Sequence, residues 1–198
     1  MQEFIKRAEE HLNNIAVISD DRKFTYADLL HHSALFASLL LQNEKDLHER
    51  RVAFMVDPGF DYVRVQWGIW RAGGIAVPLC LTYPLPSLQY VIGDTEASIV
   101  VVSSRYENVL NNLALEKGIR LIVLPGEIVQ ERELPVILPD RRAMILYTSG
   151  TTSLPKGVVT SHRNIHAQVT SLVKAWEWSS SDAIVNILPL HHVHGIVN

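Results

Sequence analysis

The sequence predicts an α/β fold with a mainly parallel sheet that carries helices on both faces. Short apolar runs alternate with helical patterns between residues 52 and 124, an order typical of parallel strands joined by crossover helices. These runs lack polar alternation, which indicates strands that are buried on both faces. With 47% hydrophobic and 20% charged residues, the 198-residue chain can form a substantial core.

The first half of the chain contains most of the predicted elements. Thr25 and Asp28 are placed as a capping box, and the apolar residues of 26–41 follow helical spacing behind it. Asp57-Pro58 is predicted to cap and begin a second helix, which ends at Gly73-Gly74. The predicted strands of the sheet are Val52–Val56, Ile75–Leu79, Ser98–Val102 and Ile119–Leu124, and further helices are predicted at Pro86–Ile92 and Ser104–Glu116.

The second half begins with a segment of different composition. Residues 125–142 are rich in proline and charge and are predicted to be a surface connector. After a loop of small residues, a helix is predicted to open near Ser161 with help from Asn164 and to run to about Trp176, followed by a strand at Ile184–Leu188. The chain is therefore divided into an α/β layer (1–124), a connector (125–142) and a last segment (143–198).

Charge and composition exclude several classes of protein. A net charge of −3 without a stripe of Lys and Arg argues against nucleic-acid binding. Cys80 is the sole cysteine, which excludes a disulfide framework and fits a reducing compartment. The N-terminus is charged, unlike a signal peptide, and no apolar run reaches the ~20 residues that cross a bilayer. The sequence therefore predicts a cytoplasmic protein without a membrane span.

The loop from Tyr147 to Gly157 indicates a chemistry. Its small and hydroxylated residues allow close approach of the backbone and donate hydrogen bonds, and Lys156 adds a positive charge, so the loop suits phosphate oxygens. It is not a Walker A loop, because Pro155 precedes the lysine and Gly157 follows it. The β-branched residues after Gly157 predict an arrangement of strand, loop and strand.

The segment from Thr148 to Gly157 resembles the phosphate-binding signature of the adenylate-forming superfamily, which includes acyl-CoA synthetases, luciferases and adenylation domains of peptide synthetases. One position departs from the signature, since Ser153 stands where glycine is usual. Three weaker runs also resemble the family in order and spacing: Phe24-Thr25-Tyr26, Trp70-Arg71-Ala72-Gly73-Gly74 and Val77-Pro78-Leu79. The resemblance covers essentially the whole chain and implies the N-terminal portion of a longer enzyme.

The resemblance implies a set of binding residues and two half-reactions. ATP and a small carboxylic acid would give an acyl-adenylate, with Mg²⁺ bridging the phosphates, and coenzyme A would then displace AMP. Lys156 would contribute charge as a catalytic residue. The phosphates would be held by Thr148, Ser149, Gly150, Thr151, Thr152, Ser153 and Lys156.

The histidines near the C-terminus allow three interpretations. His191, His192 and His194 could bind zinc, but neighbouring residues of a strand point to opposite faces and Cys80 cannot complete a mixed site, so no metal site is predicted. They could also fill the end of a strand. The resemblance to the Pro-x-[Phe/His]-His element of the family implies instead that His192 is a catalytic residue beside the acyl substrate.

The choice of acid is also suggested by the resemblance. Residues 176–178 and 186–195 are similar to malonyl-CoA and methylmalonyl-CoA synthetases, which would connect the protein to fatty acid metabolism. Medium-chain and aryl acyl-CoA synthetases are alternatives. Another alternative is a nonenzymatic truncated chain that forms homo-oligomers through exposed apolar surface near Ile184–Leu188 and Ile196-Val197.

Overall fold

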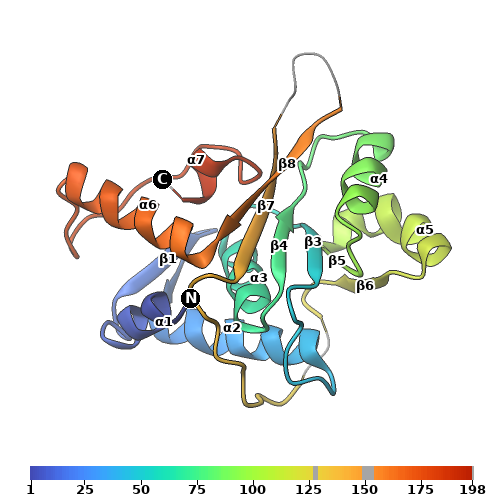
Figure 1. Ribbon diagram of the computed structural model, residues 1–198. Helices are drawn as coiled ribbons and strands as arrows, with labels where there is room; N and C mark the ends of the chain where they lie inside the picture. The colour runs from blue at the N-terminus through green and yellow to red at the C-terminus, as the bar shows by residue number, and fades with distance from the viewer. Residues whose placement is uncertain (127–128, 149–153, 198) are drawn as a thin grey trace.

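The computed structural model describes residues 1–126, 129–148 and 154–197, and its centre is a six-stranded sheet with the order β6-β5-β3-β4-β7-β8 (Figure 1). The strands of this sheet are β3 (Arg51–Met55), β4 (Ile75–Pro78), β5 (Ile99–Val102), β6 (Arg120–Val123), β7 (Arg142–Thr148) and β8 (Lys156–Ser161). A separate hairpin consists of β1 (Ile15–Ser19) and β2 (Arg22–Thr25). The helices are α1 (Gln2–Glu9), α2 (Tyr26–Leu41), α3 (Phe60–Arg71), α4 (Leu85–Asp94), α5 (Glu107–Lys117), α6 (His162–Ala175) and α7 (Val193–Ile196), with a 3₁₀ turn η1 (Ser104–Tyr106) before α5.

The predicted fold class is confirmed. The four predicted strands are present as β3, β4, β5 and β6, and β3 pairs in parallel with both β4 and β5. β6 extends the sheet beyond β5, and β7 is parallel to β4 on the other side. β8 then pairs antiparallel with β7. All the parallel strands therefore end at one edge of the sheet, called here the carboxyl edge.

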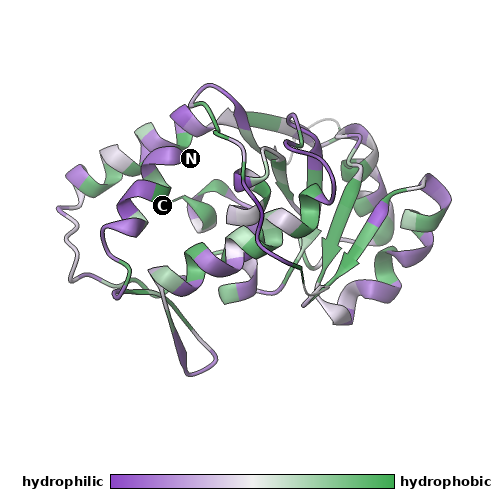
Figure 2. Cartoon of the chain, turned by 90° about the horizontal axis from the view of Figure 1, so that it is seen from below, coloured by the Kyte–Doolittle hydropathy of each residue, from purple (hydrophilic) through white to green (hydrophobic). Residues whose placement is uncertain are grey.

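Helices cover both faces of the sheet, as predicted. Alternate residues of a strand point to opposite faces, so Val52 and Phe54 of β3 pack with α2 and α3, while Ala53 and Met55 pack with α4 and α5. The strands in Figure 2 are largely green, the colour of hydrophobic residues. Within the described parts of the chain, no helix is long and apolar enough to cross a membrane.

Two helix starts agree with the sequence and one does not. The capping box predicted at Thr25 and Asp28 is confirmed for α2, and the predicted helix start near Ser161 is confirmed for α6, where Ser161 and Asn164 also form a capping box. The prediction that Asp57-Pro58 caps α3 is wrong, because the N-cap is Gly59 at φ +141° and no side chain caps it. Asp57 instead forms an ion pair with Arg105 and accepts a hydrogen bond from Tyr106 at 3.0 Å.

Two further differences concern the ends of the chain. The strand predicted at Ile184–Leu188 is wrong: the segment has no regular structure, and the side chain of Ile187 is 84% exposed. A strand needs backbone partners, and these residues pair with no other strand in the described ranges. The sequence analysis also missed α1 and the β1–β2 hairpin, whose turn places Asp20 and Asp21 at positive φ.

The connector at 125–142 is more than a surface link. Ile137 is only 2% exposed and belongs to the core beneath α2 and α3, with Leu134 packed beside it. At the end of the connector, Arg141 forms two hydrogen bonds to Asp46, at 2.6 and 2.9 Å, and a third to the carbonyl of Gly73 at 2.7 Å. The division into 1–124, 125–142 and 143–198 stays a prediction.

The ion pair between Asp46 and Arg141 predicts a loss of stability in acid. Burial would raise the pKa of Asp46, but hydrogen bonds from Arg141 and from the amide of His48 outweigh it and hold the pKa below the ordinary value. Because the folded pKa is depressed, this stabilisation is fully present above about pH 4 and is lost as pH falls through the folded pKa. We expect Asp46→Asn to cost about 2 kcal/mol at pH 7.

Urea unfolding at pH 7 and at pH 3 measures this effect. The difference in stability between the original protein and Asp46→Asn should shrink in acid. Asp21→Asn is the matched control, since Asp21 is an exposed carboxylate in the β1–β2 turn and forms no ion pair among the described residues. A difference that stays constant between the two pH values would contradict the role given to Asp46.

Candidate functional site

The predicted phosphate loop connects two antiparallel strands, which confirms the arrangement of strand, loop and strand. Thr148 at the end of β7 is paired with Lys156 at the start of β8, and Tyr147 is paired with Gly157. These strands rise toward the top of Figure 1. Five predicted phosphate-binding residues lie outside the described residues: Ser149, Gly150, Thr151, Thr152 and Ser153.

Gly157 is required by the close packing of the hairpin. A Cβ atom at this position would lie 2.9 Å from Cγ2 of Ile145 and 3.3 Å from Cζ of Tyr147, closer than carbon atoms normally approach. The ring of Tyr147 can therefore lie across the glycine, and its hydroxyl donates a hydrogen bond to Asp94 of α4. Burial, and then this carboxylate, raise the pKa of Tyr147, so the hydroxyl stays protonated as a donor.

A second tyrosine fixes the returning side of the hairpin to the same helix. The hydroxyl of Tyr90 donates a hydrogen bond to the carbonyl of Pro155 at 3.0 Å. Its ring also meets Tyr147 edge-on, with 6.2 Å between the ring centroids. The two ends of the predicted phosphate loop are thus held against α4 at the carboxyl edge of the sheet.

Lys156 carries a positive charge that no carboxylate among the described residues neutralises. Its side chain is exposed, and among the described residues its ammonium group forms no ion pair. The exposed Thr148 donates a weak hydrogen bond to the carbonyl of Lys156 at 3.4 Å. An anion at the loop end of this hairpin would therefore meet the ammonium group of Lys156.

The predicted catalytic histidine lies in a tight turn before α7. His191 is half-buried, and its ring centroid lies 4.2 Å from that of His192 and 6.1 Å from that of Tyr83. Burial, and then the neighbouring His192, lower the pKa of His191, which keeps this imidazole neutral near pH 7. His192 and His194 are exposed. Within the described ranges, no three His, Cys, Asp or Glu side chains are grouped to hold a metal ion.

The phosphate hairpin and the histidine turn both contact the same segment, residues 83–90. Tyr83, which follows β4, contacts His191, and Tyr90 of α4 binds the hairpin at Pro155. Residues 83–90 are therefore a common support for the phosphate hairpin and the histidine turn at the carboxyl edge. The sequence analysis missed both tyrosines, because no local pattern distinguishes a supporting tyrosine from a core one.

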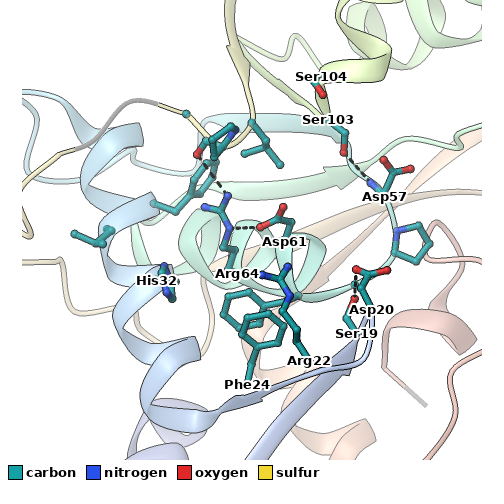
Figure 3. A pocket seen from close by; sticks show the side chains of 18 of the residues that line it. Ser19, Asp20, Arg22, Phe24, His32, Asp57, Asp61, Arg64, Ser103 and Ser104 are labelled. Carbon is teal, nitrogen blue, oxygen red and sulfur yellow. Dashed lines mark hydrogen bonds and ion pairs between the residues drawn. The ribbon is translucent and has the colours of Figure 1, made fainter.

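A cavity of about 700 Å³ lies elsewhere along the carboxyl edge (Figure 3). It opens between the β1–β2 hairpin, α2 and the residues that follow β3, β5 and β6. Arg64 inside it is bound to Asp61 at 2.6 Å, and the Asp57 at its rim is paired with Arg105. The cavity contains none of the predicted site residues, so it is separate from the hairpin and the histidines.

Comparison with known proteins identifies relatives over nearly the whole chain. The family described as "AMP-binding enzyme" matches residues 4–198. The chain is 39% identical to "Malonate–CoA ligase ACSF3, mitochondrial" of Xenopus laevis over 206 residues, which cover 97% of this chain and 36% of that protein. The chain therefore spans about a third of the length of this relative.

Solved structures agree with the sequence relatives. The structure of apo MatB from Rhodopseudomonas palustris matches with a TM-score of 0.84 at 26% identity, covering 98% of this chain and 41% of MatB. ATP-bound MatB from the same organism matches with a TM-score of 0.79 over the same shares of the two chains. The fold of this chain therefore recurs in a protein whose structure has been determined with ATP bound.

Proposed function

Because the chain belongs to the family of AMP-binding enzymes, we propose that it is part of an acid–thiol ligase that forms acyl-coenzyme A from ATP and a carboxylic acid. One observation carries the proposal: the phosphate hairpin and the histidine turn, about 40 residues apart in the chain, are both attached to residues 83–90. Such a ligase must hold a triphosphate and a carboxylate next to each other.

The first half-reaction joins the acid to AMP. A carboxylate oxygen attacks the α-phosphorus of ATP, which enters as its magnesium complex, and pyrophosphate leaves with the electrons of the broken P–O bond. The hairpin meets the need for charge neutralisation, with Lys156 facing the departing pyrophosphate and Thr148, Ser149, Gly150, Thr151, Thr152 and Ser153 donating hydrogen bonds.

The second half-reaction transfers the acyl group. The thiol sulfur of coenzyme A attacks the carbonyl carbon of the acyl-adenylate, its proton passes to solvent, and AMP leaves. His192 is assigned to the acyl side of the site, where its exposed imidazole can contact the carboxylate in the first half-reaction and the acyl-adenylate in the second. The neutral His191 packs between His192 and Tyr83 and shields one side of it from solvent.

We favour malonate or methylmalonate as the acid. The support is the name of the Xenopus laevis relative, a malonate–CoA ligase at 39% identity. The decisive test is ATP–pyrophosphate exchange by the full-length protein with malonate, methylmalonate, octanoate and benzoate. Exchange with malonate or methylmalonate is expected. Exchange with octanoate or benzoate alone would favour a medium-chain or aryl ligase, and no exchange with any acid would contradict the proposed activity.

The location of the protein is also a proposal. The sole cysteine fits a reducing compartment and favours the cytoplasm, whereas the Xenopus laevis relative is named mitochondrial. Cell fractionation of the full-length protein with a C-terminal tag distinguishes the two compartments. Recovery with the mitochondrial fraction would contradict the cytoplasmic proposal.

Residues 1–198 alone have a second candidate role as a self-associating unit. β8 forms one edge of the described sheet, with Val158 and Val159 about half exposed, and the unpaired Val185 and Ile187 are more than 80% exposed. An exposed strand edge and an exposed apolar segment both favour association with other chains.

We therefore predict that residues 1–198, expressed alone, form a dimer or larger assembly and make no acyl-coenzyme A. Light scattering over a range of concentrations measures the assembly, and Val159→Lys should weaken it, since a charge blocks edge pairing. Leu115→Lys is the matched control, because Leu115 is also exposed but lies on α5. A monomer at high concentration, or formation of malonyl-coenzyme A by this unit, would contradict the prediction.

A further inference from the structure

A hydrogen bond connects α3 to the backbone just before the histidine turn. The hydroxyl of Tyr62 donates to the carbonyl of Leu190 at 2.5 Å, across 128 residues of sequence. Tyr62 is only 5% exposed, and its ring lies 5.0 Å from that of Phe54 in β3. Burial raises the pKa of Tyr62 well above its ordinary value, so the hydroxyl is a protonated donor near neutral pH.

On the other side of the histidines, the turn is closed by an amide side chain. Asn186 donates to the carbonyl of Gly195 at 2.8 Å and accepts a hydrogen bond from the amide of Leu188 at 3.0 Å. Gly195 makes the closure possible, because a Cβ atom there would lie 2.3 Å from the carbonyl oxygen of Pro189. Residues 186–195 thus form a closed loop that includes His191 and His192.

The closed loop meets the body of the protein at Leu190, which packs against the core, and at His191, whose ring lies beside Tyr83. The residues before it are exposed and belong to no strand, so backbone pairing does not hold them. Leu190 is half-buried against the core beside α3. The hydrogen bond from Tyr62 therefore acts at the place where the loop meets the body of the protein, one residue before His191.

We propose that Tyr62 is a positioning residue that fixes the histidine turn beside the carboxylate substrate. The proposal rests on the proposed ligase function. Tyr62 touches no reacting atom. Its hydroxyl connects the carbonyl of Leu190 to α3, the helix that carries Tyr62 and packs against the sheet. The phosphate hairpin depends on different contacts, with Tyr90 and Asp94 of α4. Loss of the Tyr62 hydroxyl should therefore lower kcat/KM for the acid and leave KM for ATP unchanged.

Tyr62→Phe tests the proposal, since it removes the hydroxyl and keeps the ring. In the full-length protein we expect kcat/KM for malonate in ATP–pyrophosphate exchange to fall about 10-fold, because a small displacement of a group at the reacting centre slows the reaction strongly. KM for ATP should stay within about twofold. Tyr26→Phe is the matched control, because no hydrogen bond of the Tyr26 hydroxyl is seen in the described structure.

Hydrogen–deuterium exchange of the same variants separates this proposal from the proposed function. Tyr62→Phe should accelerate amide exchange in residues 186–197 and leave the β7 and β8 amides unchanged. Asn186→Ala should accelerate the same amides, since it opens the loop from the other side. Unchanged exchange of 186–197 in Tyr62→Phe would overturn the proposal, whether or not the protein is active.

The kinetic outcomes are also decisive. If kcat/KM falls equally for malonate and for ATP, and the melting temperature is lower, Tyr62 has a general structural role and the positioning role is overturned. A wild-type protein that is inactive with every acid would contradict the proposed function. In that case, faster amide exchange in Tyr62→Phe would still show that Tyr62 holds the turn.

Discussion

Replacing Lys156 by alanine in the full-length protein is expected to slow malonate-dependent ATP–pyrophosphate exchange by about 100-fold or more. The lysine is the first residue of β8, and its ammonium group pairs with no carboxylate among the described residues. Its charge is therefore available to the pyrophosphate, which gains negative charge as its bond to the α-phosphorus breaks.

The comparison of three variants isolates the contribution of this charge. Lys156→Arg should retain part of the activity, because it keeps the charge but places its donors differently. Lys23→Ala removes the same charge from the exposed face of β2 and should leave the exchange rate unchanged. If Lys156→Ala exchanges as fast as the original protein, the β7–β8 hairpin is not the phosphate site.

Replacing Gly73 by alanine is expected to lower the free energy of unfolding by about 3 kcal/mol. Two physical effects act together at this residue. Its φ of +79° disfavours any side chain, and a Cβ atom would lie 2.2 Å from Oδ1 of Asp46 and 2.8 Å from Nη2 of Arg141. The methyl group must therefore displace the ion pair that joins the connector to the loop between α2 and β3.

Gly118 provides a control for the backbone effect alone. It has a similar φ of +63° as the C-cap of α5, but a Cβ atom there would meet nothing within 4 Å. Gly118→Ala should therefore cost only about 1 kcal/mol. Urea unfolding at pH 7 measures both variants. If the two substitutions cost the same, the contact with Asp46 and Arg141 contributes nothing to stability.

Much of the fold could be predicted because its signals are local. The apolar runs of β3 and β5 and the capping boxes at Thr25 and Ser161 depend on residues within four positions of each other. The strand, loop and strand arrangement around Lys156 was predicted in the same way, from Gly157 and the β-branched residues after it. These features follow from the chemistry of neighbouring residues.

The errors arose where a distant partner decides the local structure. The sequence of Ile184–Leu188 is apolar enough for a strand, but a strand forms only when another strand supplies hydrogen bonds. Asp57 can cap a helix, yet it pairs instead with Arg105, which lies 48 residues away. Local propensity is a weak preference, and tertiary contacts override it.

By itself, therefore, the sequence determined the family, the parallel sheet and the residue types of the phosphate hairpin. Only the tertiary structure decided how the candidate site is held together, through Tyr83 and Tyr90 beside the two motifs and Tyr62 behind the histidine turn. The reason is physical. Periodicity and capping act over one or two turns of chain, whereas a hydrogen bond such as that between Tyr62 and Leu190 exists only after the helices have packed on the sheet.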